Sequence, residues 1–165
     1  MNKIIFLFLM FSAMLFAKWQ VGALHTDNET ATTFTTYDNQ TESILIIAVV
    51  LEDYNGYSFV VIKNSKIKEE DNLMLVIKDN DGDNINYSIY SGDIMEEGMA
   101  LIIGEDAKRG NLLTKMLYKG QSAKLYNYDT DELLATFDLK GIKQIIQKHV
   151  GSSYWYKYKL NSIYD

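Results

Sequence analysis

The residues best suited to chemistry in this sequence are three aspartates at alternate positions, Asp79, Asp81 and Asp83. Carboxylates at this spacing form the first half of an EF-hand calcium loop. The second half does not follow, because Gly82 takes the fourth loop position instead of the sixth and Tyr90 replaces the final glutamate. We therefore predict a hairpin turn with solvated carboxylates and no tight metal site. The three aspartates remain a candidate only for a weak calcium site.

The two histidines, His25 and His149, stand far apart in the sequence. Neither belongs to a metal-binding spacing such as HExxH, and no GxSxG elbow or nucleotide-binding glycine motif is present. His149 falls near the end of an expected helix, where a protonated ring interacts favourably with the helix dipole. His25 is expected at the surface or in a loop. We therefore predict no catalytic residue and no cofactor.

Two further groups of acidic residues lie in expected loops. They are Asp93, Glu96 and Glu97, and Asp129, Asp131 and Glu132. Paired carboxylates across a cleft can hydrolyse glycosides, but the fold sets the distance between them. Solvated loop charges are the expected role of these residues, and a hydrolase stays an alternative.

The last part of the sequence is rich in aromatic residues. Three tyrosines and a leucine alternate there with a tryptophan and two lysines: Tyr154, Trp155, Tyr156, Lys157, Tyr158, Lys159 and Leu160. A period of two is typical of a strand. We therefore predict that this tail adds a strand beside or over Ile44–Leu51, with its tyrosines facing inward. Exposed tyrosine and tryptophan offer large, stiff contact surfaces to protein or carbohydrate partners. The candidate partner-binding residues are Trp155, Tyr154, Tyr156 and Tyr158.

Short runs of β-type residues fill most of the remaining sequence. They are Thr30–Tyr37, Ser43–Leu51, Tyr57–Lys63, Leu73–Lys78, Ile85–Tyr90, Met99–Ile103, Gln121–Asn127 and Leu133–Leu139. Ser43–Leu51 is apolar throughout, which is typical of a strand covered on both faces. Proline is absent, so clusters of glycine, asparagine and aspartate must form the turns. The even spacing of short strands predicts an antiparallel β-sandwich or barrel.

Two segments have the periodicity of helices instead. Asn111–Lys119 places apolar side chains on one face, and Gly120 is suited to a left-handed C-cap. Leu139–Val150 carries an apolar stripe, with Asp138 available as its N-cap and Gly151 as its C-cap. The predicted fold is therefore mainly β, with two short helices.

The first residues have the pattern of a secretory signal peptide, with Lys3 before the apolar run Ile4–Ala17. This run is short for a membrane-spanning helix, which needs about 20 apolar residues. We predict cleavage after Ala17, with a second possible position after Ala23; an uncleaved helix is the alternative. The expected organisation is a signal peptide at 1–17, a β-sandwich domain at 18–151 and an aromatic tail at 152–165.

Charge and cysteine content narrow the expected partners. The net charge is −6 at pH 7, and an acidic domain gains nothing from counterion release on nucleic acid. Anionic lipid surfaces are poor partners for the same reason. Without cysteine, the sequence has no disulfide, no thiolate nucleophile and no lipoprotein anchor.

Three stretches carry a resemblance to a known family. They are Lys18–Val21 with its tryptophan, Leu112–Leu125 with a leucine helix that leads into a strand, and Ala135–Ile142 with the pattern F-x-L-x-G-[FI]. The layout resembles, over residues 18–150, the invasion-associated locus B (IalB-like) family of small exported bacterial proteins. The closing motif is also similar to that of the VasI-like type VI secretion accessory family. Both families often carry cysteine pairs, which this sequence lacks.

The resemblance implies an immunoglobulin-like β-sandwich in the periplasm or on the cell surface, without enzymatic activity. Together with the signal pattern and the acidity, it predicts an exported envelope binding or accessory protein, with host-cell or surface interaction as one role that the resemblance implies. The expected partner is another protein or an envelope component, with no nucleic acid and no membrane anchor in the mature form. A structural or accessory subunit of a secretion apparatus is the alternative, and a hydrolase is the third reading.

Overall fold

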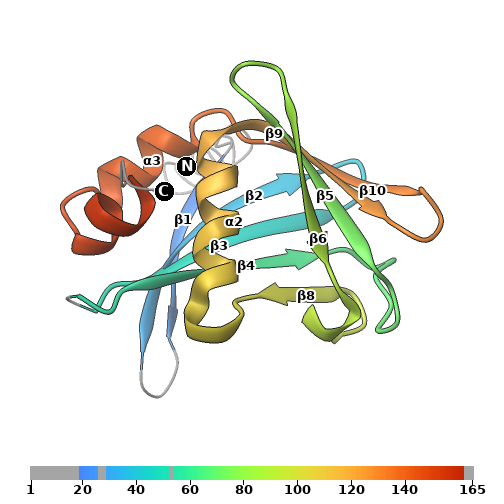
Figure 1. Cartoon of the computed structure of the whole chain (residues 1–165), viewed down its shortest axis with the longest axis horizontal. Helices are drawn as coiled ribbons and strands as arrows, with labels where there is room; N and C mark the ends of the chain where they lie inside the picture. The colour runs from blue at the N-terminus through green and yellow to red at the C-terminus, as the bar shows by residue number, and fades with distance from the viewer. Residues whose placement is uncertain (1–18, 26–28, 53, 162–165) are drawn as a thin grey trace, which may run out of the picture.

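A computed structural model describes residues 19–25, 29–52 and 54–161 of the protein. The predicted signal peptide lies outside these residues. The fold is mainly β and consists of two antiparallel sheets, which confirms the predicted β-sandwich (Figure 1). No helix among the described residues is long and apolar enough to cross a membrane.

The two sheets contain six and four strands. The larger sheet has the order β1 (Gln20–His25), β2 (Thr30–Asp38), β3 (Ser43–Val50), β4 (Tyr57–Lys63), β8 (Met99–Ile102) and β7 (Ile94–Glu96). The smaller sheet has the order β10 (Leu133–Asp138), β9 (Gly120–Asn127), β5 (Leu73–Asp79) and β6 (Asn84–Ile89). All eight predicted strands are present, each within one residue of its predicted ends. Strands β1 and β7 were not predicted, because one contains a glycine and the other has only three residues.

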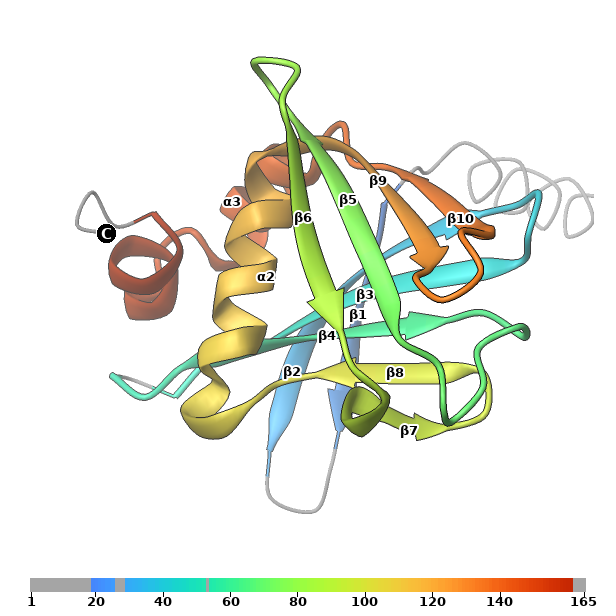
Figure 2. The same ribbon diagram turned by 45° about the vertical axis from the view of Figure 1, so that its right-hand side comes forward.

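Helix α2 (Lys108–Lys119) and helix α3 (Ile142–Val150) confirm the two predicted helices. Helix α2 runs along the open side of the sandwich and contacts strands of both sheets (Figures 1 and 2). Short helical turns η1 (Ser91–Asp93), η2 (Glu105–Ala107) and η3 (Tyr156–Leu160) complete the fold. One cluster of buried apolar side chains from both sheets, α2, α3 and the C-terminal segment forms the main core.

The predicted helix caps are confirmed in part: Gly151 is the C-cap of α3, and Gly120 is the C-cap residue of α2. Gly120 has an extended backbone with φ −82°, so it is not a left-handed cap. Glycine is needed there for a close approach, since a Cβ would lie 2.7 Å from Ile77 Cγ2. The N-cap of α3 is Gly141 at φ +90°, a conformation that favours glycine. Asp138 instead accepts the backbone N–H of Lys140 at 3.1 Å, in the turn before the helix.

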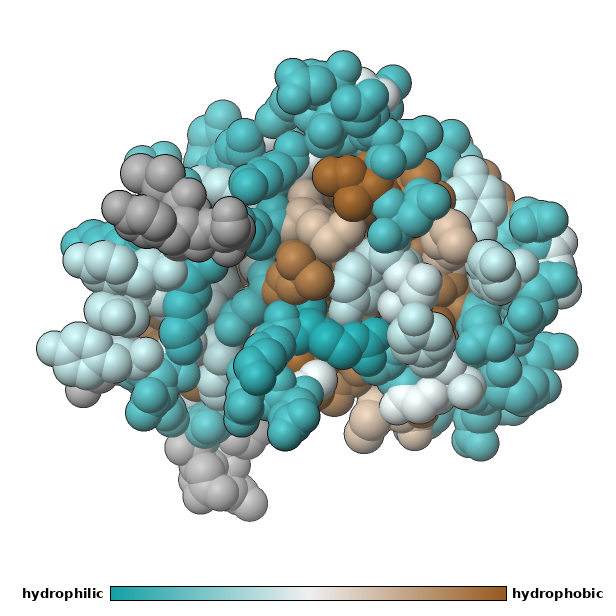
Figure 3. Space-filling view, in the orientation of Figure 1, coloured by the Kyte–Doolittle hydropathy of each residue, from teal (hydrophilic) through white to brown (hydrophobic). Residues whose placement is uncertain are grey.

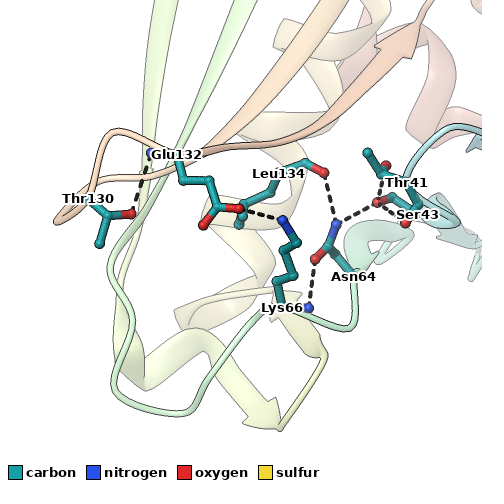
Figure 4. Close-up of polar contacts among 7 residues, drawn as sticks. All are labelled: Thr41, Ser43, Asn64, Lys66, Thr130, Glu132 and Leu134. Atoms are coloured by element: carbon teal, nitrogen blue, oxygen red, sulfur yellow. Dashed lines mark hydrogen bonds and ion pairs between the residues drawn. The ribbon is translucent and has the colours of Figure 1, made fainter.

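Polar side chains join the two sheets at one end of the sandwich (Figure 4). The Asn64 amide donates to Ser43 Oγ at 2.7 Å and to the carbonyl oxygen of Leu134, on β10, at 3.0 Å. Lys66 pairs with Glu132 beside it. Because Asn64 is buried, these bonds replace water for its amide and hold β10 over the larger sheet.

The aromatic tail does not form the predicted strand. Residues 154–160 are helical, and Trp155, Tyr156 and Leu160 are buried, whereas Tyr154 and Tyr158 are exposed. The hydroxyl of Ser153 accepts the backbone N–H of Tyr156 at 3.1 Å, as an N-terminal cap does. The tyrosines therefore do not share one inward face; residues 162–165 of the predicted tail lie outside the described part.

Candidate ligand-binding pocket

A pocket of about 510 Å³ lies between the β3–β4 loop and the segment that follows α3. Its walls come from the loop residues Leu51, Tyr54 and Gly56 and from Ser153, Tyr154 and Trp155. Figures 1 and 2 both place the β3–β4 hairpin and the C-terminal helical segment at the same end of the molecule. None of the six lining residues carries a charge.

Two exposed tyrosines line this pocket, and a third packs on one of them. We call the three the tyrosine rim: Tyr54, Tyr154 and Tyr158. The rings of Tyr54 and Tyr154 meet edge to face, with centroids 5.0 Å apart. The ring centroids of Tyr154 and Tyr158 lie 4.5 Å apart, and the two ring planes are tilted by 35° to each other. Their side chains are 74%, 38% and 62% exposed, respectively, so ring surface remains available to a ligand. Figure 3 shows side chains of intermediate hydropathy gathered at this end of the molecule.

Trp155 forms part of the pocket wall but is only 1% exposed. Its indole N–H donates to Asn111 Oδ1, on α2, at 3.1 Å. The same oxygen accepts the backbone N–H and the hydroxyl of Ser58, on β4, at 2.8 and 3.0 Å. Trp155 therefore gives the pocket a fixed base, and its burial contradicts the predicted strand, in which the tyrosines and not this tryptophan would face inward.

Tyr156, a predicted partner-binding residue, faces the core. Its hydroxyl lies 2.9 Å from that of Tyr118 on α2, and the two rings meet edge to face. Burial, together with the hydrogen bond to Tyr156, raises the pKa of Tyr118 above its usual value. Tyr156 thus fastens the C-terminal segment to the helix and contributes nothing to the exposed rim.

The polar groups at the base of the pocket are engaged within the protein. Ser153 Oγ donates to the Val150 carbonyl at 2.6 Å. Lys159 Nζ donates to the carbonyl oxygen of Gly56 at 2.8 Å and so ties the C-terminal segment to the β3–β4 loop. A ligand therefore meets aromatic ring faces and tyrosine hydroxyls rather than charged groups.

The three alternate aspartates lie in the hairpin between β5 and β6, as predicted. Asp79 Oδ1 accepts the backbone N–H groups of Asp81 and Asp83, both at 2.9 Å. One carboxylate of the three therefore stabilises the turn itself. Within the described ranges, no three or more histidine, aspartate or glutamate side chains are grouped so that they could hold a metal ion. Whether the turn binds calcium weakly stays a prediction to be tested.

The histidines lie on different elements and contact different groups. His25 Nδ1, on β1, lies 3.0 Å from the Thr30 hydroxyl, on β2. The exposed ring of His149, in the last turn of α3, meets the buried ring of Phe34 edge on, with centroids 6.3 Å apart. The structure does not bring the two histidines together in one site.

Three of the loop carboxylates have structural contacts. Asp93 pairs with Arg109 through both oxygens, and this hydrogen bonding raises the pKa of Arg109 above its usual value. Glu132 pairs with Lys66, and Asp129 accepts a backbone N–H at 3.4 Å. These contacts join neighbouring loops. Asp129 and Glu132 are solvent-exposed as predicted, whereas the side chain of Asp93 is only 11% exposed and is not a solvated loop charge.

Comparisons with protein-family models, with curated proteins and with solved structures found no match to this sequence. The resemblance to the IalB-like family therefore stays a prediction. Of the six lining residues, sequence reasoning identified Tyr154 and Trp155, together with the neighbouring Tyr158, and it missed the other four: Leu51, Tyr54, Gly56 and Ser153. An aromatic residue inside the turn sequence Tyr54-Asn55-Gly56 was the available signal, since turns carry side chains outward.

Proposed function

We propose that this protein is an exported binding protein of the cell envelope, without catalytic activity, and that its ligand site is the pocket beside the tyrosine rim. The observation that carries the proposal is a pocket of about 510 Å³ lined by the packed, exposed rings of Tyr54 and Tyr154, with the exposed ring of Tyr158 packed on Tyr154. Ligand pockets typically have about 300–1,000 Å³ and aromatic walls. Tyrosine binds with little loss of side-chain entropy, because its ring is stiff and has a polar tip.

The way in which the rim is supported favours binding over a chance surface cluster. Trp155 and Tyr156 are anchored by α2, and Lys159 joins the tail to the loop that carries Tyr54. A site held by packed elements keeps its shape before the ligand arrives, which lowers the entropic cost of binding.

The contacts of Trp19 favour the proposed cleavage after Ala17 over cleavage after Ala23. Trp19 is buried in the main core, and its indole N–H donates to the Lys140 carbonyl at 3.1 Å. Cleavage after Ala17 would leave this contact intact, whereas cleavage after Ala23 would remove Trp19 and most of β1. The expected partner of the exported protein is another protein or an envelope component.

Site-specific photo-crosslinking in cells tests this proposal. A photoreactive amino acid replaces Tyr158, and a matched copy carries it at Tyr128, a tyrosine that is 59% exposed beyond the end of β9. We expect a discrete crosslinked species from position 158 that is absent from position 128 and is lost when Tyr54→Ala and Tyr154→Ala are added. Equal crosslinking from both positions, or none from 158, would count against the pocket as the ligand site.

A further inference from the structure

The outer face of the six-stranded sheet is apolar and is not covered by any other described element. Residues on β2, β3, β4 and β8 alternate between the main core and this outer face, and the register aligns the outward side chains in rows. One row runs through Thr35, Ile46, Val61 and Leu101. The row on one side of it contains Thr33, Ala48 and Phe59, and the row on the other side contains Tyr37, Ile44 and Lys63, so the polar side chains of the rows lie mainly on β2. We call this surface the open face.

The open face keeps large apolar side chains partly in solvent. Ile44, Ile46, Phe59, Val61 and Leu101 are each partly exposed, and Tyr37 is 41% exposed. Smaller neighbours are buried beneath the rings of Tyr57 and Phe59 in a second apolar cluster, which is separate from the main core. Of the outward side chains on β2, β3, β4 and β8, Lys63 alone is charged. The side that carries α2 is by contrast largely hydrophilic (Figure 3).

The sequence of β3 requires a cover that the described residues do not provide. Its run is apolar at consecutive positions, which is typical of a strand buried on both faces. The C-terminal tail was the predicted cover, but it packs at the end of the β3–β4 hairpin and inserts Trp155 into the main core.

The size of the face limits what can cover it. The whole outer side of five adjacent strands, β1, β2, β3, β4 and β8, about 4.8 Å apart and on average about seven residues long with a rise of about 3.4 Å, gives a face of roughly 600 Å². That reaches the top of the range for the largest apolar patch on a monomer, about 300–600 Å². Two such faces in contact would bury about 1,200 Å² in total, which a specific interface requires.

We infer that the open face is the interface of a symmetric dimer, in which the larger sheets of two copies of this protein pack face to face. A two-fold interface must be self-complementary, and a nearly uncharged apolar surface meets that condition. Because the net charge is −6, the charged surfaces of two copies repel each other. Contact through a nearly uncharged face therefore has the smallest electrostatic cost. In aligned sheets about 10 Å apart, the side chains of Ile46 and Val61 from one copy would interdigitate with those of the other copy.

This inference is independent of the proposed function. The tyrosine rim lies at the loop end of the β3–β4 hairpin, while the dimer contacts come from the middle of the strands. The dimer would carry two pockets, and loss of the dimer leaves each pocket assembled.

Analytical ultracentrifugation of protein purified from cells that express the full sequence tests the dimer, with the N-terminus determined by mass spectrometry. We expect twice the mass of one chain at about 100 µM, where a dimer with a micromolar Kd is almost fully formed. Val61→Lys and Ile46→Lys are expected to give folded monomers by circular dichroism. Leu112→Lys, at a 54% exposed position on α2, is the matched control and should stay dimeric.

A milder variant keeps the test decisive if a lysine unfolds the sheet. Val61→Thr retains the shape and strand preference of valine, and it should raise the dimer Kd at least tenfold without loss of fold. Wild-type protein that stays monomeric at about 100 µM would overturn the inference. This holds equally if another protein covers the face or if residues 1–17 do. A dimer that persists in both lysine variants would overturn it as well, because its interface would lie elsewhere.

Discussion

The side-chain oxygen of Asn111 accepts the indole N–H of Trp155 at 3.1 Å, and it also accepts two hydrogen bonds from Ser58. This single oxygen joins α2, the larger sheet and the C-terminal segment. Trp155 is at the same time part of the pocket wall. The fold and the candidate site therefore depend on the same tryptophan.

Replacement of Trp155 should destabilise the protein strongly. Trp155→Ala removes a buried ring, which typically costs about 3–5 kcal/mol of unfolding free energy. Trp155→Phe keeps an aromatic ring but leaves part of the Asn111 acceptor unpaired, at a cost of about 1–3 kcal/mol. Urea unfolding measures both, with Tyr158→Ala as the exposed aromatic control, expected within about 0.5 kcal/mol of wild type. Equal losses for Trp155→Ala and Tyr158→Ala would show that the tail is not part of the core.

Asp38 should make stability depend on pH in the acid range. Burial raises its pKa, but the backbone N–H groups of Thr136 and Gln40, at 2.7 and 2.9 Å, outweigh burial and hold the pKa below 3.8. A carboxyl whose pKa is lower in the folded state stabilises the fold above its unfolded pKa, and this contribution is lost as the pH falls through the folded pKa. We therefore expect Asp38→Asn to be less stable than wild type at neutral pH.

The difference in unfolding free energy between Asp38→Asn and wild type should shrink as the pH falls below 3.8. Unfolding by urea at a series of pH values measures this change. Asp81→Asn, in the exposed β5–β6 turn, is the control and should match wild type throughout. If the stability loss of Asp38→Asn stayed constant down to the lowest pH measured, the ionised carboxylate would be excluded as the source of the stabilisation.

The β5–β6 turn should depend on Asp79 and not on calcium. Asp79→Ala removes the acceptor of two backbone N–H groups and should cost about 1–2 kcal/mol, whereas Asp81→Ala should cost little. Calcium should leave the melting temperature unchanged. If the turn did bind it, calcium at about 100 times its Kd would raise the free energy of unfolding by about 2.7 kcal/mol. A rise of several degrees that Asp81→Ala abolishes would contradict this and establish the weak site.

The exported protein should begin at Lys18. Cleavage after Ala17 keeps Trp19 and its hydrogen bond to Lys140. N-terminal sequencing of protein from the periplasm or the medium measures this directly. An N-terminus at Leu24 would mean that β1 is dispensable, and an intact Met1 on the purified protein would falsify export by cleavage.

Local sequence was sufficient for most of the secondary structure. The alternation of side chains along Tyr57–Lys63 and the turn residues around Gly82 are properties of neighbouring positions, and eight strands were predicted from such signals. The sequence predicted the class of this arrangement, an antiparallel sandwich or barrel, but not which strands pair. The conformation of Gly120 and the N-cap of α3 were predicted wrongly, because the close approach of Ile77 and the backbone angle of Gly141 decided them, whereas Gly151 is the C-cap of α3 as predicted.

The tail and the pocket were decided by tertiary contacts. Aromatic residues at consecutive positions suit a strand or a helix equally, and the choice fell to the helix because Trp155 and Tyr156 find partners in Asn111 and Tyr118 on α2. Tyr54 meets Tyr154 across a hundred positions of the sequence, which no local pattern encodes. Local periodicity reports which face of an element is apolar, whereas the burial of a particular ring depends on which distant groups the fold brings to it.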